Sequence, residues 1–193
     1  MRWSICILFV LFMSALDASV GSVFEIGGIR AQFLPATVVF ICLSAPKRVT
    51  LRAAMCAGVA ADLFAPTILS DGNTLVVIGP RVLGFALGAL AVVPLRGLLY
   101  RQNPLSAPIA TMLFSLLASL VFIAVWIVRS LLLDTSAPWW PSTGASELML
   151  RLGAALGDGL MAIVVFWVLN KTRPLWGFAN TTRVSPGAAR QGL

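Results

Sequence analysis

Apolar residues gather in six stretches of the chain, and polar residues gather in the short segments between them. The apolar stretches cover residues 3–19, 31–45, 53–68, 74–95, 107–128 and 148–169. A transmembrane helix needs about 20 mostly apolar residues to cross the hydrocarbon core of a bilayer. The pattern therefore predicts an all-α integral membrane protein, a bundle of about six transmembrane helices. The second and third stretches are shorter than a usual span, so they need flanking residues, a break in the helix or a thin bilayer.

Short polar connections separate the stretches and leave room for one domain only. Pro, Gly, Ser and Asn mark segments 44–46, 70–73, 102–104 and 138–144, as is typical of turns. We expect a single transmembrane domain over residues 1–170 and a flexible cytoplasmic tail over residues 171–193. Segment 21–32 has two interpretations, a segment along the membrane surface or an ordinary loop. Trp139 and Trp140 are typical of anchors at the headgroup level.

Composition excludes a soluble globule and the enzyme mechanisms that depend on histidine. Of the 193 residues, 59% are hydrophobic and 11% are charged, whereas a soluble domain has about 25% charged residues. The chain has no histidine, which excludes Ser-His triads, His-containing metal sites and histidine proton relays. Cys6, Cys42 and Cys56 lie in apolar stretches without paired spacing, so we expect buried apolar side chains rather than disulfides or a zinc site. We therefore expect no enzyme activity, no metal and no cofactor.

The net charge of +7 indicates membrane topology rather than nucleic-acid binding. Lys and Arg lie between apolar runs instead of on one solvated face, so we expect no nucleic-acid partner. One predicted side holds Arg2, Lys47, Arg48, Arg52, Arg96, Arg101, Lys171, Arg173, Arg183 and Arg190 and no acidic residue. The acidic residues on or beside the other side are Asp17, Glu25, Asp71, Asp134 and Glu147. By the positive-inside rule both termini are cytoplasmic, and the basic side can also attract anionic membrane lipid.

Residues 3–19 have a second interpretation as a secretory signal peptide. Arg2 would be its charged start and residues 4–16 its apolar core. Segment 17–21 contains no clean cleavage site between small residues, and further apolar stretches follow. We therefore expect this stretch to be retained as a membrane helix.

Four charged residues fall inside the predicted spans, namely Asp62, Arg81, Arg151 and Asp158. Such charges are unfavourable in a bilayer and normally face protein or water with a partner. Arg151 is close enough to the end of its helix to reach the interface. Asp62 and Arg81 lie on consecutive helices at similar depths, about 9 to 10 Å below one interface at 1.5 Å per residue. We therefore predict an intramembrane ion pair between Asp62 and Arg81, which either fixes helix packing or takes part in binding.

Small residues form stripes beside these charges. The stripes are Gly58 with Asp62, Gly84 and Gly88 with Arg81, and Gly153 and Gly157 with Asp158. Residues three, four and seven apart share a helix face, so Gly58 lies on the side of Asp62, and Gly84 and Gly88 lie on the side of Arg81. On the last stretch, Gly153 and Gly157 lead into Asp158. Small residues let two helix backbones approach closely. We expect tight packing or a partner face at these positions, and enough proximity for Asp62 to meet Arg81.

Residues 58–66 (GVAADLFAP), a short polar turn and residues 79–88 (GPRVLGFALG) resemble the rod shape-determining protein MreD family. The chain size, the number of spans and the FLP at residues 33–35 are also similar. The resemblance implies a non-enzymatic component of the bacterial inner membrane that works in cell elongation. The implied partners are an MreC-like bitopic membrane protein, MreB-like filaments, and the peptidoglycan polymerase and transpeptidase. Asp62, with Gly58 beside it, matches the aspartate of the family by position.

Two other classes compete with this interpretation. A small-molecule-binding component of an energy-coupling-factor transporter, to which MreD is similar in architecture, also has about six spans. Such components usually dock through an AxxxA surface on the first helix, and the nearest equivalent here, residues 14–18 (SALDA), is partly polar. An intramembrane aspartyl protease needs two cooperating aspartates, but residues 155–158 (ALGD) miss the GxGD pattern. Both classes are therefore less favoured than a scaffold.

Overall fold

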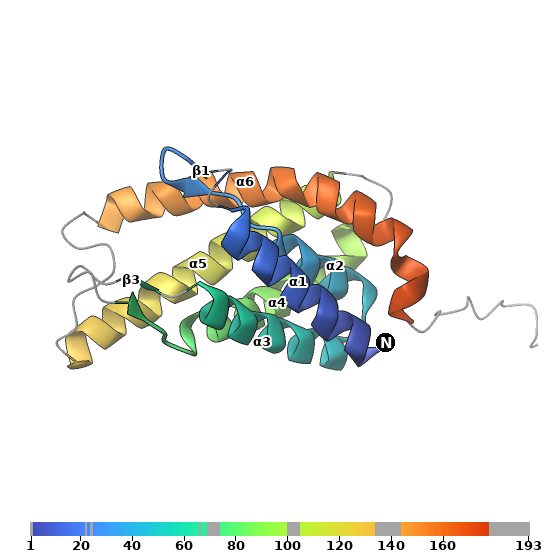
Figure 1. Cartoon of the computed structure of the whole chain (residues 1–193), viewed down its shortest axis with the longest axis horizontal. Coiled ribbons are helices and arrows are strands. Elements are labelled where there is room, and N and C mark those ends of the chain that lie inside the picture. The colour runs from blue at the N-terminus through green and yellow to red at the C-terminus, as the bar shows by residue number, and fades with distance from the viewer. Residues whose placement is uncertain are drawn as a thin grey trace, which may run out of the picture.

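A computed structural model describes residues 2–21, 23, 25–65, 67–68, 74–99, 105–133 and 144–177, and most of these residues are helical (Figure 1). The helices are α1 (Trp3–Ser19), α2 (Leu34–Ser44), α3 (Lys47–Phe64), α4 (Pro80–Leu99), α5 (Ser106–Leu133) and α6 (Gly144–Lys171). A short 3₁₀ helix, η1 (Arg173–Trp176), follows α6. Each predicted apolar stretch overlaps one of these helices, which confirms the predicted helical class.

Within the described residues, three helices are long and apolar enough to cross a membrane, with candidate spans Pro80–Gly97, Ser106–Leu132 and Ala145–Lys171. By length and composition, the described helices therefore support three of the about six predicted transmembrane helices. α1 and α2 are apolar but have 17 and 11 residues, and α3 begins with Lys47 and Arg48. At 1.5 Å per residue, α2 is about 16 Å long, roughly half the thickness of a hydrocarbon core.

The short helix α2 lies at the centre of the bundle. It contacts each of the other five α-helices, and all its residues from Leu34 to Leu43 are buried. α4 packs against both α3 and α5, and α5 packs against α6 (Figure 1). A helix that is apolar on every side has to be enclosed by protein or lipid. The continuous apolar run of α2 therefore suits its central position.

Two short hairpins complete the described chain, and the sequence pattern predicts neither. Strand β1 (Glu25–Ile26) pairs antiparallel with β2 (Ile29–Arg30), and β3 (Thr67–Ile68) pairs antiparallel with β4 (Thr74–Leu75). Gly27 and Gly28 form the turn between β1 and β2 with φ of 61° and 81°, which glycine adopts without strain. Segment 21–32, predicted as a surface segment or loop, thus contains a hairpin that packs on α6 (Figure 1).

The start of α1 and the end of η1 meet at one end of the bundle (Figure 1). The backbone N–H of Arg2 donates to the carbonyl oxygen of Trp176 at 3.0 Å. Trp176 is buried, and its ring lies 5.0 Å from that of Phe9 and 5.6 Å from that of Phe40. Residues 173–177 of the predicted tail are therefore packed onto the bundle. Residues 139 and 140 and residues 178–193 lie outside the described residues.

Candidate functional site

Asp62, near the end of α3, accepts hydrogen bonds from the start of α4. Its carboxylate oxygens accept the backbone N–H of Gly79 at 2.8 Å and that of Arg81 at 3.3 Å. The first N–H groups of a helix have no partner within that helix. A carboxylate satisfies them, and its negative charge is favourable at a helix N-terminus. Asp62, only 5% exposed, therefore caps the helix that follows its own.

Asp17, near the end of α1, caps α2 in the same way. Its carboxylate oxygens accept the backbone N–H of Phe33 at 2.6 Å and that of Leu34 at 3.0 Å. The next residue, Pro35, has no N–H group that would need a partner. The backbone carbonyl of Asp17 in turn accepts a hydrogen bond from the Arg30 guanidinium. Asp17, whose charge in the sequence indicates membrane topology, thus also joins two parts of the fold.

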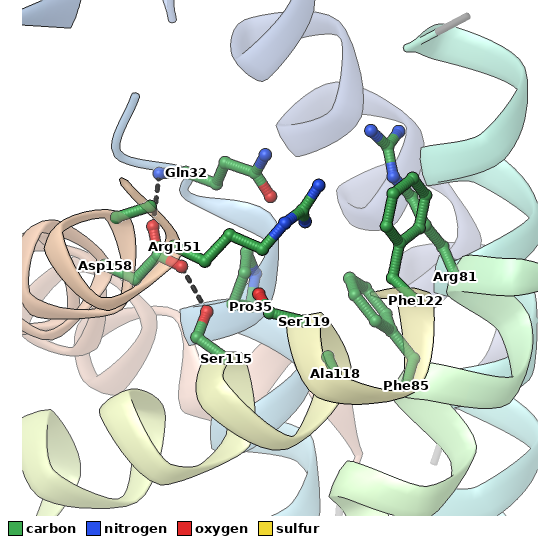
Figure 2. Close-up of a pocket in the computed structure, with 11 residues that line it drawn as sticks. Gln32, Pro35, Arg81, Phe85, Ser115, Ala118, Ser119, Phe122, Arg151 and Asp158 are labelled. Atoms are coloured by element: carbon green, nitrogen blue, oxygen red, sulfur yellow. Dashed lines mark hydrogen bonds between the residues drawn. The ribbon is translucent and has the colours of Figure 1, made fainter. Parts of the chain in front are cut away.

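Asp158 on α6 joins two other parts of the bundle. One carboxylate oxygen accepts the backbone N–H of Gln32, just before α2, at 2.6 Å, and the other accepts the hydroxyl of Ser115 on α5 (Figure 2). Asp158 is 4% exposed, so these protein donors take the place of water. The predicted packing or partner face around Asp158 is therefore an internal face in the structure.

Two arginine side chains donate hydrogen bonds to backbone carbonyl groups at the C-terminal ends of helices. The last carbonyl groups of a helix lack donors within the helix, and positive charge is favourable near them. The Arg81 guanidinium donates to the carbonyl oxygens of Ala61 at 2.5 Å and Ala65 at 3.1 Å, at the end of α3. The Arg96 guanidinium donates to the carbonyl oxygen of Ala45 at 3.0 Å, at the end of α2. Charged side chains in this apolar chain thus satisfy backbone groups at helix ends.

Asp62 and Arg81 lie together as predicted, but their side chains bond to backbone groups rather than to each other. The two residues are neighbours, but the carboxylate bonds to the backbone of α4 and the guanidinium bonds to the backbone of α3. Within the described part of the chain, the one direct salt bridge joins Arg151 to Glu147, with 2.8 Å between nitrogen and oxygen. Asp62 and Arg81 therefore link the two helices through backbone groups, because each side chain is already occupied by a helix end.

The predicted glycine stripes are close-packing positions, but they face different helices. A Cβ atom on Gly58 would lie 2.5 Å from the Cα of Val82, so Gly58 allows α3 to approach α4. Gly84 and Gly88 face α5 instead, where a Cβ on Gly84 would lie 2.8 Å from a carbonyl oxygen. The prediction that Gly84 and Gly88 help Asp62 meet Arg81 is therefore wrong. The long Arg81 side chain reaches α3 without their help.

Gly153 and Gly157 on α6 face the chain that enters α2. A Cβ on Gly153 would lie 2.5 Å from Cδ1 of Ile29, and one on Gly157 would lie 3.0 Å from the Cβ of Ala31. These contacts bring β2 and the following residues close to α6. Both glycines therefore serve internal packing, one of the two roles that the sequence predicts for them.

A pocket lies beside these contacts and is lined from α2, α4, α5 and α6. It contains about 540 Å³ of empty space, including its open mouth. Arg81 and Arg151 both line it, with their guanidinium carbons 5.8 Å and 4.5 Å from the centre of the Phe122 ring (Figure 2). Arg151, which the sequence places near the membrane interface, therefore lines a pocket within the bundle.

Sequence reasoning missed several residues that hold this region together. An acidic residue in the last turn of an apolar helix is unfavourable for that helix. Asp17 is such a residue, and this position in the sequence is the signal that its carboxylate has a partner on another element. Gln32 and Ser115 give no comparable signal, because Gln and Ser occur in many loops and helices without a structural role. Their importance follows only from the position of Asp158 in the folded chain.

No protein-family model, curated protein or solved structure matches the chain. The contacts described above are therefore the basis for assigning a function.

Proposed function

We propose that the protein is a non-catalytic membrane component of a bacterial rod-shape machinery, similar to MreD. It would bind an MreC-like bitopic membrane protein and help to position peptidoglycan synthesis. MreB-like filaments and a peptidoglycan polymerase and transpeptidase would belong to the same assembly. The observation that carries the proposal is the reciprocal contact between the two segments of family resemblance, because Asp62 caps α4 while Arg81 caps α3.

The use of the aspartates supports a packing role over a catalytic one. Asp17, Asp62 and Asp158 each accept two hydrogen bonds from backbone or hydroxyl donors within the chain. A general acid or base has to reach a reacting group of a substrate. Carboxylates whose two oxygens each accept a hydrogen bond from within the chain suit a rigid docking body better than an active site.

The same proposal places all six α-helices in a bacterial inner membrane with both termini cytoplasmic. α4, α5 and α6 are long enough to cross on their own, and α2 is enclosed by the other helices. Exposed apolar side chains on α4, such as Leu83, Leu87 and Leu90, suit lipid or a partner helix. The contact between Arg2 and Trp176 supports termini on one side, because it joins the start of α1 to η1.

Depletion of the protein in a rod-shaped bacterium that encodes it tests this proposal. We expect rounded and wider cells, because wall synthesis would lose its positioning, and we expect an MreC-like protein to copurify with the tagged chain. A Gly58→Leu variant should fail to restore the rod shape, because its side chain would collide with the backbone of α4. In the matched Gly97→Leu variant, the added Cβ has no atom of the described residues within 4 Å, so this variant should restore the rod shape. Normal cell width after full depletion would contradict the proposal.

A second candidate is the small-molecule-binding component of an energy-coupling-factor transporter. One observation favours it, the pocket between the helices that Arg81 and Arg151 line. Tight saturable binding of a vitamin by the purified protein, with copurification of an ATPase module in place of an MreC-like protein, would establish this candidate over the scaffold.

A further inference from the structure

The pocket presents two guanidinium groups to one space. Figure 2 shows Arg81 from α4 and Arg151 from α6 both extending toward the region around Phe122. Arg81 uses one terminal nitrogen on the carbonyls of α3, and Arg151 uses Nε and one terminal nitrogen on Glu147. In the residues that the structure describes, no hydrogen bond engages the remaining nitrogens of these two side chains. Each arginine is thus held in place by some of its donors and keeps others for a ligand.

The acidic residue at the pocket leaves these donors available. Among the described residues that line the pocket, Asp158 is the one carboxylate. Its two oxygens already accept the N–H of Gln32 and the hydroxyl of Ser115 (Figure 2). The negative charges that balance the arginines across the wider region, on Asp62 and Glu147, are not part of the lining. The pocket surface therefore carries more positive than negative groups with free bonding capacity.

Neutral donors and aromatic rings complete the lining. The side-chain amide of Gln32 points toward the same space as the Arg151 guanidinium, and Ser119 lies across from it (Figure 2). These hydrogen-bond donors come from different helices. They suit a tetrahedral oxyanion better than a planar carboxylate, because the oxygens of a tetrahedral oxyanion point in several directions. Phe85 and Phe122 supply an apolar wall on one side of the pocket. Such a wall suits a ligand with a hydrocarbon part next to its anionic group.

We propose that this pocket binds the phosphate group of a phosphorylated amphiphile. Arg81 and Arg151 would hold the phosphate oxygens, since arginine matches phosphate with paired donors. Phe85 and Phe122 would contact the adjoining apolar part of the ligand. The ligand class is that of a phospholipid head group, or of a soluble phosphate ester with the same chemistry. This role goes beyond the scaffold proposed above and does not rest on it.

Calorimetric titration of the purified full chain in non-ionic detergent tests the proposal, with dihexanoylphosphatidic acid as the probe. We expect saturable binding that weakens roughly tenfold or more in Arg151→Gln, because an ionic hydrogen bond is lost. Arg96→Gln is the matched control, since Arg96 also joins two helices through a backbone carbonyl but lies outside the pocket. Its affinity should equal that of the unchanged protein. Dihexanoylglycerol, with the same tails and no phosphate, should show no saturable binding.

A second variant keeps the test valid if an arginine variant fails to fold. Ser119→Leu fills the pocket and leaves both arginines in place, so it should abolish binding while the thermal melting curve stays intact. Glycerol phosphate that binds as tightly as the lipid, with the same loss in Arg151→Gln, would support the phosphate site, assign it to a soluble ligand and overturn the contact between the two phenylalanines and an apolar tail. Three results would overturn the phosphate site. They are binding of the lipid by Arg151→Gln and Ser119→Leu as tight as by the unchanged protein, an affinity for dihexanoylglycerol equal to that for dihexanoylphosphatidic acid, or tighter binding of decanoate than of dihexanoylphosphatidic acid.

The cell-shape assay separates this inference from the proposed function. Loss of lipid binding in Ser119→Leu with a normal rod shape would leave the phosphate site established and show that elongation does not need it. Absence of saturable binding in the unchanged protein would overturn the inference, whatever depletion does to cell shape.

Discussion

Asp62 and Asp158 use the same carboxylate chemistry in two different settings. Asp62 accepts N–H groups only 17 and 19 residues away, on the next helix, and Arg81 returns a contact across the same helix pair. Asp158 accepts an N–H 126 residues away and a hydroxyl from a third helix, beside an open pocket. The first contact is local and reciprocal, so two helices suffice to form it. The second requires the assembled bundle and leaves polar space for a ligand.

Asp62→Leu should have the largest effect on stability. Two partly buried N–H groups at the start of α4 would lose their acceptor, and Arg81 would lose a nearby negative charge. We expect the free energy of unfolding to fall by about 3 kcal/mol or more. Asp62→Asn keeps one acceptor oxygen and should lose only about 1 kcal/mol. Unfolding in detergent, followed by circular dichroism, measures both variants, and equal losses would refute the capping role.

Asp158→Leu should destabilise the protein less than Asp62→Leu. One backbone N–H would lose its acceptor, at a cost of about 1 to 3 kcal/mol. The hydroxyl of Ser115 can turn to a carbonyl of its own helix, as serine hydroxyls in helices commonly do. We expect a loss of about 2 kcal/mol in the same unfolding assay. A loss greater than that of Asp62→Leu would reverse the ranking of the two sites.

Hydropathy predicts the helices well because burial in lipid or protein needs only a continuous apolar stretch. α1 covers the whole of its predicted stretch, and α5 and α6 each extend a few residues beyond theirs. α3 starts at Lys47, six residues before its predicted stretch, because Lys and Arg are good helix formers and Pro46 can precede a helix. α4 starts later than predicted, at Pro80, because the preceding residues form β4 and the Gly79 turn.

The candidate site is predictable only in part. Asp62, Arg81 and Asp158 stand out in the sequence because a charge in an apolar stretch needs a partner. The sequence does not show that these partners are backbone groups, because helix ends come together only in the folded bundle. Gln32 and Ser119 are ordinary polar residues, and their place at the pocket follows from how α2 and α5 cross.

Gly58→Ala and Gly157→Ala compare how tightly the two regions are packed. The added methyl at Gly58 would meet the backbone of Val82 at 2.5 Å, whereas the one at Gly157 would meet a methyl group at 3.0 Å. Backbone yields less than a side chain, so we expect a loss of about 1 to 3 kcal/mol for Gly58→Ala. Gly157→Ala should lose less than about 1 kcal/mol, because the gain in helix propensity offsets part of the strain. Melting temperatures in detergent rank the pair, and a larger loss at Gly157 would show that the region of Asp158 is the tighter one.

Gly97→Ala should have the smallest effect and the opposite sign. Gly97 lies in α4, and no atom of the described residues is within 4 Å of an added Cβ, so the substitution meets no described neighbour. Alanine loses less backbone freedom than glycine on folding, and we expect a gain of about 0.5 kcal/mol so close to the end of the helix. The same assay then gives the packing cost at Gly58 as the difference between the two variants, with helix propensity removed. Destabilisation by Gly97→Ala would mean that glycine at this end of α4 has a role beyond the described contacts. The difference in free energy of unfolding between Gly58→Ala and Gly97→Ala would then no longer measure the packing cost at Gly58 alone.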